Sequence, residues 1–239
     1  GHPGRTLLPE RELRVPVDVA PRLDQVGVEA AGVVEEVGAG VKDFKPGDPV
    51  TFLAAPTYRR HCVINASRAV KIPGKVDNFA LWISEPAACA VNGVSGSEFK
   101  PGDRVAHLGC GYMGLLVLQA MPREILGRLV CIEPDPKRRK LVRDLGVKEI
   151  YNPEKKDIVA LAEEIGGFDV VIEASGSKGT IPVATKMVRR GGILNIFGWH
   201  AGEETVPTHD WHMMGLRVLN TAPGFAPDFG RCFRAAVHL

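Results

Sequence analysis

Hydrophobic and polar positions change their period along the chain, and the second half has the clearest pattern. There, short apolar runs alternate with stretches in which apolar residues recur at helical spacing. Strands that alternate with helices form a parallel, doubly wound sheet covered on both faces. The pattern therefore predicts an α/β fold with strands near 104–108, 128–132, 149–151, 169–173, 192–197 and 216–220, and with helices near 112–121, 136–145, 155–165 and 178–189.

The first half combines β-branched residues with frequent glycine and proline. Four prolines among residues 1–24 break any long helix and predict an extended arm with one strand near Leu13 to Val19. Short strands, broken by glycines and joined by a Pro-Gly turn, are expected at 26–38, 41–50 and 60–70. This pattern is typical of a compact, smaller β-barrel domain.

The two halves are joined by residues 78–94, which return to a helical period and predict a helix interrupted by Pro86. We expect a first domain at 1–95, a second at 96–225, and a C-terminal segment at 226–239 that returns toward the first domain.

The sequence Phe-Lys-Pro-Gly-Asp occurs at 44–48 and again at 99–103. Proline presets the backbone φ angle of a turn and glycine follows it easily, so one turn chemistry explains both copies. We interpret them as two similar turns and not as an internal repeat.

A strand, a glycine-rich turn and a helix give the strongest functional signal. Residues 104–108 lead into Gly109-Cys110-Gly111-Tyr112-Met113-Gly114, a G-x-G-x-x-G pattern, and a later apolar run ends at Glu133. The first glycine allows the tight turn, the second lets the backbone approach a pyrophosphate, and the third lets the helix pack close to the strand. Together with the acid 19 residues after the last glycine, the pattern predicts a dinucleotide site.

The acid and the helix start predict which dinucleotide binds. The free N–H groups at the start of the helix would hold the phosphates. Glu133 would accept hydrogen bonds from the adenosine ribose, which favours NAD because a 2′-phosphate would meet a carboxylate. The basic run Lys137-Arg138-Arg139-Lys140 is either a solvated helix start, which we favour, or a phosphate contact through Arg138.

Two more turns follow predicted strands of the same sheet. Glu173-Ala174-Ser175-Gly176 ends the strand near 169–173, and Phe197-Gly198-Trp199-His200 ends the strand near 192–197. Ligands of doubly wound sheets bind at the carboxyl ends of the strands. We expect both turns to line the cofactor, with ordinary loops as the alternative.

The composition and charge of the chain argue against several classes of partner. The chain has 30 Lys and Arg against 28 Asp and Glu, so its net charge of +2 predicts no basic face for nucleic acid. No apolar run approaches the ~20 residues of a membrane span, and no charged start precedes an apolar core, so we expect no membrane contact. Five cysteines without a close pair predict neither a disulfide framework nor a CxxC zinc site, which fits a cytoplasmic protein.

Taken in order, these motifs resemble the medium-chain dehydrogenase/reductase superfamily, which includes zinc-type alcohol and polyol dehydrogenases and zinc-free quinone reductases. The resemblance implies a reduced GroES-like catalytic domain, a Rossmann domain that binds NAD, and hydride transfer to or from an alcohol or carbonyl. The matching motifs run from about Val26 to Thr221 and comprise residues 27–34, 45–48, Ser84-Glu85-Pro86, 109–114, 169–176 and 190–192.

The chain departs from this family where its members bind zinc. Members with a catalytic zinc usually carry an early cysteine, a Gly-His-Glu motif, and a later acid or cysteine. Here the cysteine is missing and Val28 replaces the histidine, although Glu29 remains and Glu85 lies in the Glu-Pro context of a polyol dehydrogenase ligand. The cysteine-rich lobe for structural zinc is also missing. Because a catalytic zinc takes three protein ligands, we predict a protein without a metal site.

Without zinc, another group must donate or accept the proton. His200 is the first candidate, because it follows the turn at Phe197-Gly198 and histidine titrates near neutral pH. His61 and Glu85 are the second and third. For each, a solvated or structural side chain is the alternative.

Residues 208–214 are rich in His, Trp and Met. They could form a substrate lid, with His209 and His212 on one face of a helical turn. They could instead form an interface helix. We favour this alternative and therefore expect a homodimer. Two histidines without a third ligand make a weak metal site.

These observations lead to three hypotheses on function. The first is a zinc-independent oxidoreductase that transfers hydride between NAD(H) and a small alcohol or carbonyl substrate. The second is a zinc-free enone or quinone reductase, in which hydride goes to carbon and little acid catalysis is needed. The third is a nucleotide-binding subunit without catalytic activity.

Overall fold

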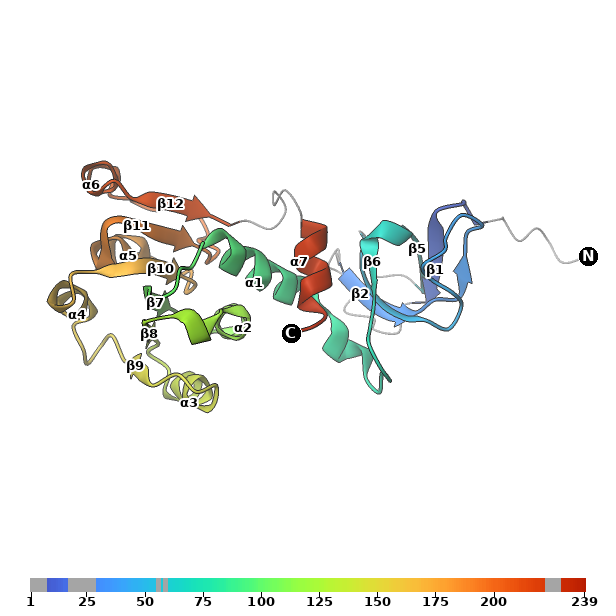
Figure 1. Ribbon diagram of the computed structural model, residues 1–239, viewed down its shortest axis with the longest axis horizontal. Helices are drawn as coiled ribbons and strands as arrows, with labels where there is room; N and C mark the ends of the chain where they lie inside the picture. Colours follow the sequence, from blue (N-terminus) through green and yellow to red (C-terminus); the bar gives the residue numbers. More distant parts are fainter. Residues whose placement is uncertain (1–7, 17–28, 55–56, 58–59, 222–228) are drawn as a thin grey trace, which may run out of the picture. The chain divides into compact units, whose positions relative to one another are not determined.

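The computed structural model describes residues 8–16, 29–54, 57, 60–221 and 229–239 (Figure 1). The chain divides into two compact units, Gly1–Ala88 together with Gly230–Leu239, and Cys89–Phe229. The predicted boundaries at 95/96 and 225/226 both lie inside the second unit. The first predicted boundary differs from the observed division between Ala88 and Cys89, which falls within helix α1 (Glu85–Gly96).

The second unit contains a six-stranded sheet in the order β12-β11-β10-β7-β8-β9, in which every neighbouring pair is parallel (Figure 1). This confirms the predicted α/β fold class. The strands are β7 (Arg104–Leu108), β8 (Arg128–Ile132), β9 (Glu149–Tyr151), β10 (Phe168–Glu173), β11 (Val188–Ile196) and β12 (Arg217–Asn220).

Successive residues of the central strands point to opposite faces of the sheet. In β7, Ala106 packs into a core with residues of α4 and α5, whereas Val105 packs into a core with residues of α1, α2 and α3. The near-continuous apolar strands predicted from sequence are therefore buried on both faces. The covering helices are α2 (Tyr112–Ala120), α3 (Pro136–Asp144), α4 (Ile158–Glu164) and α5 (Thr180–Met187); η3 (Arg123–Ile125) and α6 (Thr208–Met214) complete the unit.

Side-chain caps explain where two of these helices begin. Asp135 accepts the backbone N–H groups of Lys137 and Arg138 at the start of α3, where Pro136 occupies the first turn. Asp157 caps α4 in the same way, so this helix begins three residues after the predicted start. Helix α5 ends earlier than predicted because Val188 already pairs with Phe168 as the first residue of β11.

The first unit consists of two three-stranded antiparallel sheets, β3-β1-β5 and β2-β4-β6. Inward-facing residues of both sheets, including Leu13, Phe52 and Ile64, form one buried core. The strands are β1 (Glu12–Pro16), β2 (Glu29–Val33), β3 (Glu36–Val37), β4 (Pro49–Leu53), β5 (His61–Asn65) and β6 (Ala69–Lys71).

The prediction of a single strand at 60–70 was wrong in one respect. It is two strands, β5 and β6, separated by the short 3-10 helix η1 (Ala66–Arg68). Asn65 accepts the backbone N–H of Ser67 and so starts this helix. The break lets β5 pair with β1 while β6 pairs with β4 in the other sheet.

The expected helix at 78–94 also differs. It comprises the 3-10 helix η2 (Phe79–Trp82) and α1, which begins at Glu85. Pro86 therefore lies in the first turn of α1, where its missing N–H removes no intrahelical hydrogen bond. A further helix, α7 (Phe229–Ala236), was not predicted.

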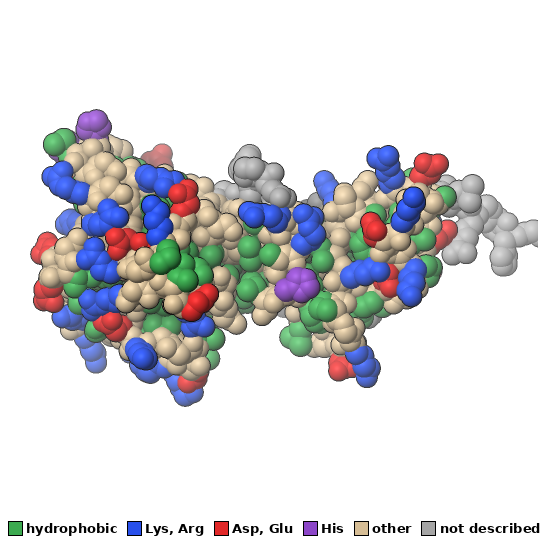
Figure 2. All heavy atoms as spheres, in the orientation of Figure 1, with side chains coloured by type: hydrophobic (Ala, Val, Ile, Leu, Met, Phe, Trp, Pro, Cys, Tyr) green, Lys and Arg blue, Asp and Glu red, His purple; other side chains and the backbone are tan. Residues whose placement is uncertain are grey.

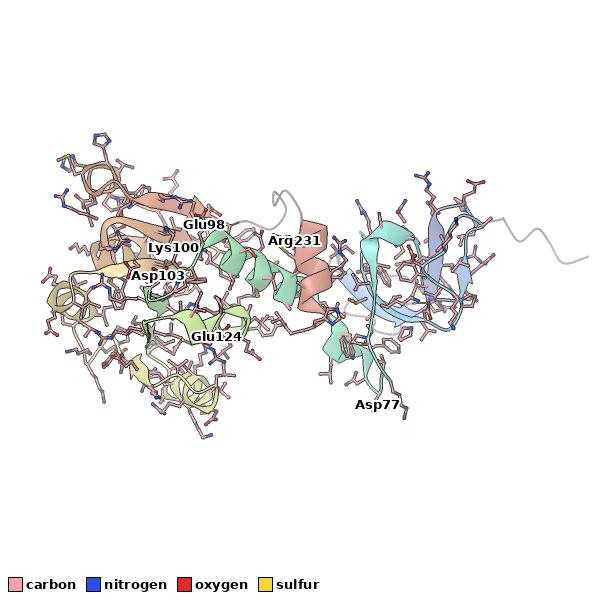
Figure 3. The ribbon with its side chains drawn as sticks, viewed as in Figure 1. Asp77, Glu98, Lys100, Asp103, Glu124 and Arg231 are labelled. Carbon is pink, nitrogen blue, oxygen red and sulfur yellow. The ribbon has the colours of Figure 1, made fainter. Side chains whose placement is uncertain are left out.

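The two Phe-Lys-Pro-Gly-Asp turns have the same structure, as expected. In the first, the backbone N–H of Lys45 donates to Asp48 Oδ2 (2.9 Å); in the second, that of Lys100 donates to Asp103 Oδ2 (2.8 Å; Figure 3). The glycine of each turn has a positive φ, 92° and 88°, which favours glycine. The turns precede β4 and β7, which belong to unrelated sheets.

Positive and negative side chains are interspersed on the face shown in Figure 2, in keeping with the small net charge. Within the described part of the chain, no helix is long and apolar enough to cross a membrane. All five cysteines are buried and carry free thiols.

Candidate functional site

The glycine-rich turn joins β7 to α2 at the centre of the six-stranded sheet, and each glycine has a distinct environment. Gly109 has a φ of 87°, and a Cβ there would lie 2.5 Å from Ser175 Cα. A Cβ on Gly114 would lie 2.1 Å from the carbonyl oxygen of Gly109, so only glycine permits this close packing of helix and strand.

Gly111 differs because the space in front of it is open. Among the described residues, a Cβ there would meet only Arg138 Nη1, at 3.8 Å. Gly111 precedes α2 without a side-chain cap, so the first N–H groups of the helix are directed at this space. An open glycine, uncapped N–H groups and a nearby guanidinium are what a phosphate group needs.

The other turn residues divide between core and surface. The side chain of Cys110 is fully buried in the core, Met113 is half-buried, and Tyr112 is exposed. Cys110 can therefore contact a ligand only through its backbone.

Glu133 lies directly after β8 and is 2% exposed. Its Oε2 accepts the backbone N–H of Cys110 (2.7 Å), and its Oε1 accepts that of Asp135 (2.9 Å). The carboxylate thus connects the glycine-rich turn to the loop before α3. Each oxygen retains a second acceptor position.

The basic run at the start of α3 contains two arginines with different surroundings. Arg139 Nη1 donates to the carbonyl oxygens of Glu133 (2.9 Å) and Pro134 (2.5 Å), which fixes it to the protein. Arg138 is exposed and lies beside Gly111. Of these two, Arg138 is the one that faces the open space.

The turn after β10 packs against the glycine-rich turn, and the turn after β11 packs against the turn after β10, in both cases through glycines. Ser175 touches Gly109, as described above. A Cβ on Gly176 would lie 2.5 Å from the carbonyl oxygen of Trp199, and one on Gly198 would lie 2.6 Å from Gly176 N. The predicted cofactor-lining residues Ala174, Ser175, Gly176 and Gly198 are therefore brought together with the G-x-G-x-x-G turn.

Phe197 contributes differently from its neighbours. A Cβ on Gly93 of α1 would lie 2.6 Å from Phe197 Cδ2, so the ring packs against this helix. The side chain of Phe197 is directed at α1, and its backbone N–H donates to the carbonyl oxygen of Glu173 (2.9 Å).

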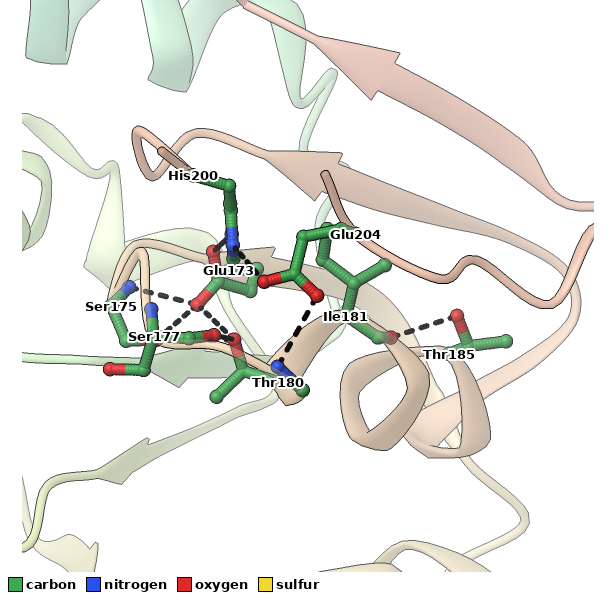
Figure 4. Close-up of polar contacts among 9 residues, drawn as sticks. Glu173, Ser175, Ser177, Thr180, Ile181, Thr185, His200 and Glu204 are labelled. Atoms are coloured by element: carbon green, nitrogen blue, oxygen red, sulfur yellow. Dashed lines mark hydrogen bonds and ion pairs between the residues drawn. The ribbon is translucent and has the colours of Figure 1, made fainter. Parts of the chain in front are cut away.

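A fully buried carboxylate, Glu173, lies beneath these turns (Figure 4). Its Oε1 accepts the N–H and hydroxyl groups of Ser175 and the hydroxyl of Thr180 (3.0 Å), the first residue of α5. Its Oε2 lies 2.6 Å from His200 Nε2. Four donor groups from three segments thus satisfy this charge, as a buried charge requires.

His200 lies between two carboxylates (Figure 4). Its side chain is 8% exposed, and its Nδ1 is buried, makes no hydrogen bond and lies 3.6 Å from Glu204 Oε1. Glu204 Oε2 accepts the backbone N–H of Gly179 (3.4 Å), next to the start of α5. The first predicted catalytic residue is therefore enclosed, whereas the neighbouring Trp199 is 88% exposed.

A second buried histidine, His107, lies in β7 below the start of α2, with Nε2 3.1 Å from the position of a Cβ on Gly114. Burial lowers the pKa of His107 to about 4, although Glu173 and the backbone at Gly114 and Gly109 oppose this shift. The ring is neutral at pH 7.

The other two predicted catalytic residues belong to the first unit. His61, at the start of β5, is exposed, and its Nε2 lies 3.7 Å from Glu35 Oε2. Glu85, at the start of α1, donates its backbone N–H to Glu29 Oε2 (2.8 Å). Burial raises the pKa of Glu29 to about 7; the Glu85 carboxylate adds to this rise, and the hydrogen bond from the Glu85 backbone opposes it.

Val28, which takes the place of the zinc-binding histidine, lies outside the described residues. The described residues nearby, Glu29 and Glu85, provide two carboxylates where a catalytic zinc takes three protein ligands. Within the described ranges, no group of three or more His, Cys, Asp and Glu side chains is placed to hold a metal ion. These side chains do not fit a zinc site.

The sequence interpretation included Glu173 in a cofactor-lining turn without a role for its side chain, and it missed Thr180 and Glu204. One signal for Glu173 was present, an acid directly after an apolar strand. The hydrogen-bond partners of Glu173 lie up to 27 residues away in the sequence and follow no local spacing.

Comparison with known families identifies the chain. A model described as "zinc-binding dehydrogenase" matches residues 113–236, more than half of the chain, and one described as "alcohol dehydrogenase GroES-like domain" matches residues 11–74. The chain belongs to the medium-chain, zinc-type alcohol dehydrogenase superfamily. The resemblance seen in the sequence is confirmed, and the two units correspond to the Rossmann-like and GroES-like folds of this superfamily.

Two curated members have similar sequences. The chain is 29% identical over 214 residues to an uncharacterised zinc-type alcohol dehydrogenase-like protein of Escherichia coli, YdjJ, and this match covers 76% of the chain and 62% of YdjJ. It is 27% identical over 212 residues to (R,R)-butanediol dehydrogenase of Bacillus subtilis, with 76% and 61% coverage. The chain thus spans about three fifths of the length of these two dehydrogenases.

A solved superfamily structure has the same fold. A protein of Sinorhizobium meliloti described as a zinc-binding dehydrogenase, bound to NADP, superposes with a TM-score of 0.80 at 25% identity. The alignment covers 98% of the chain and 83% of that protein. Binding of an NAD(P) cofactor is typical of this superfamily.

Proposed function

We propose that this protein is an NAD-dependent, zinc-independent oxidoreductase that transfers hydride between the nicotinamide and a small alcohol or carbonyl compound. The observation that carries the proposal is the open space at Gly111, bounded by uncapped N–H groups of α2 and by Arg138. Membership of the dehydrogenase superfamily supports the reaction type.

The preference for NAD rests on Glu133. With the pyrophosphate at the glycine-rich turn above β7, the strand order supports an adenosine that lies toward β8, where Glu133 follows the strand. The carboxylate already holds two backbone N–H groups, but its remaining acceptor positions suit ribose hydroxyls and not a 2′-phosphate. Glu133→Ala should reduce the preference for NADH over NADPH; a wild-type protein that prefers NADPH would contradict this role.

Zinc independence is supported by Val28, which stands where the family has a histidine, and by the two carboxylates of Glu29 and Glu85, which alone remain of the expected ligand set. Elemental analysis of the purified protein tests it directly. Stoichiometric zinc that survives dialysis against a chelator would overturn this part of the proposal.

Three side chains remain candidates for the proton transfer that accompanies hydride transfer. His200 is the candidate that lies in the same unit as the glycine-rich turn, whereas His61 and Glu85 lie in the first unit. Replacing each in turn and measuring turnover with NADH and small carbonyl compounds would identify the one that is needed.

Reduction of an enone or a quinone is the second candidate function. It is favoured by the burial of His200 Nδ1, because hydride addition to carbon needs little acid catalysis. A screen of alcohols, aldehydes, enones and quinones with both cofactors separates the two reactions. Cofactor binding without turnover in any of them would favour a subunit without catalytic activity.

The remaining parts of the proposal concern the localisation, substrate class and oligomeric state of the protein. A cytoplasmic homodimer that acts on a small-molecule substrate fits the sequence, and β12, an edge strand with α6 beside it in sequence, offers a surface for a second copy. Sedimentation velocity measures the oligomeric state; a monomer at micromolar concentration would contradict the dimer.

The sharpest test of the cofactor site uses Gly111. Its φ of −69° and the absence of close neighbours mean that Gly111→Ala should fold normally. The added methyl group would nevertheless occupy the space proposed for the pyrophosphate, so the Kd for NADH, measured by fluorescence titration, should rise roughly tenfold. An unchanged Kd together with an unchanged melting temperature would contradict the proposed site.

A further inference from the structure

The buried polar cluster around Glu173 lies in the half of the sheet opposite Glu133. Strands β10 and β11 lie on one side of β7, and β8 and β9 lie on the other. With the pyrophosphate above β7 and the adenosine toward β8, the nicotinamide half of the cofactor lies above β10 and β11. This placement rests on the proposed function.

The turns that would hold the nicotinamide half have little side-chain bulk to fix them. They meet through glycines, Gly109 against Ser175 and Gly176 against the backbone of Trp199. Glycine contacts permit close approach, but they leave the backbone free to take other conformations. Another part of the structure must therefore hold these turns in register.

Glu173 and His200 supply that restraint. From its buried position, Glu173 binds its own turn at Ser175, the start of α5 at Thr180, and the loop after β11 at His200. Glu204 binds the same loop to Gly179, on the far side of the imidazole. Buried hydrogen bonds of this kind make the groups that they join rigid.

We propose that Glu173, His200 and Glu204 are positioning residues that hold the loop after β11 against the turn after β10, which packs on the glycine-rich turn, and so form the nicotinamide half of the cofactor site. His200 acts through Glu173 and is not the proton donor. Its Nε2 is occupied by Glu173, and its Nδ1 is buried and directed toward Glu204, so neither nitrogen reaches a substrate.

The arrangement also determines what faces outward. Because His200 is held inward, the adjacent Trp199 exposes its indole at the carboxyl edge of the sheet. The protein has three tryptophans, Trp82, Trp199 and Trp211. Replacing Trp82 and Trp211 with phenylalanine leaves the emission of Trp199 as a reporter of the loop.

Two ligands separate the two halves of the cofactor site. NADH occupies both halves, whereas ADP-ribose has the adenosine and pyrophosphate but no nicotinamide. In His200→Leu we expect the Kd for NADH to rise roughly tenfold and the Kd for ADP-ribose to change less than about twofold, with a shift in Trp199 emission. His200→Gln, which keeps an N–H donor for Glu173, should restore NADH affinity and retain turnover.

Glu204→Gln provides a second variant with a milder change, and Glu203→Gln is its matched control. Glu203 is exposed and adjacent in sequence. We expect Glu204→Gln to weaken NADH binding about threefold, because its contacts are longer than those of Glu173, and Glu203→Gln to leave it unchanged. If His200→Leu fails to fold, Glu204→Gln and His200→Gln still test the proposal.

Three results would overturn the positioning role. Equal losses for NADH and ADP-ribose would show a general structural role, and unchanged NADH affinity in both His200→Leu and Glu204→Gln would show none. A His200→Gln variant with normal NADH affinity, no turnover and one ionisation missing from its pH profile would make His200 the proton donor. A wild-type protein that binds neither ligand would instead refute the proposed function, and the positioning role with it.

Discussion

Each unit contains a carboxylate withdrawn from water, and the two have opposite surroundings. Glu173, in the second unit, is fully buried and accepts four hydrogen bonds from three segments. Glu29, in the first unit, is partly buried, accepts the backbone N–H of Glu85 and lies beside the carboxylate of that residue. The pKa of Glu29 consequently rises to about 7.

The difference shows that burial alone does not assign a role to an acid. A buried carboxylate surrounded by donors stabilises one conformation, because any other would leave its charge unpaired. A carboxylate with few donors and an acidic neighbour binds a proton more tightly and titrates near neutral pH. The first arrangement suits positioning, and the second suits proton exchange.

Removing the Glu173 carboxylate should have the largest effect. Glu173→Leu leaves His200 and the backbone N–H of Ser175 without their acceptor, whereas the Thr180 hydroxyl keeps the carbonyl oxygen of Ser177. The free energy of unfolding should fall by about 4 kcal/mol. Urea unfolding followed by circular dichroism measures this change. A loss below about 1 kcal/mol would show that the four hydrogen bonds contribute little.

Acid should weaken the second unit through His107. The ring is neutral when folded, with a pKa of about 4, whereas the unfolded chain takes up a proton near its ordinary pKa of 6.5. Stability is therefore complete above pH 6.5 and decreases as pH falls toward 4, by about 3 kcal/mol. Urea unfolding followed by Trp211 fluorescence should show this decrease, and His107→Gln should reduce it; an identical pH dependence in the variant would contradict the assignment.

The first unit should respond to pH in the opposite direction. Because the pKa of Glu29 is raised from 4.5 to about 7, the folded state holds a proton that the unfolded state releases, and stability falls as pH rises through this range. Glu29 is partly solvated, so we expect a change of about 1 kcal/mol or less. Trp82, in η2 beside β2, reports on this unit, and Glu29→Gln should abolish the decrease.

The smallest expected effect separates the two causes of the Glu29 shift. Burial is the larger cause and the charge of Glu85 the smaller, so Glu85→Gln should lower the pKa of Glu29 only in part. Titration of the Glu29 carboxyl by NMR measures this value. A return to the ordinary pKa of 4.5 would show that repulsion between the two acids dominates and not burial.

The second unit followed the sequence closely because its signals are local. An apolar run, the glycines at 109, 111 and 114, and an acid after the next strand specify a strand, a turn and a helix without reference to the rest of the chain. The break between β5 and β6 was not found, because Asn65 starts a 3-10 helix whose effect is to send the next strand into a different sheet. Local patterns do not specify which sheet a strand joins.

The candidate site also contains features that local sequence patterns predicted and features that they did not. The sequence found both turns at the edge where the glycine-rich turn lies, because the carboxyl ends of parallel strands meet at one edge. It treated His200 as a reactive side chain, whereas the structure encloses this residue between Glu173 and Glu204. Solvent exposure depends on chain segments that are distant in sequence, and no local pattern reveals it.

The sequence by itself determined the superfamily, the order of strands and helices, and the position of the dinucleotide turn, because backbone geometry at glycines and the alternation of apolar residues are properties of short segments. The tertiary structure decided which groups each acid meets. Glu29 and Glu173 are the same residue type beside strands, but the fold buries Glu29 next to a second acid, which raises its pKa, and it brings four donors to Glu173.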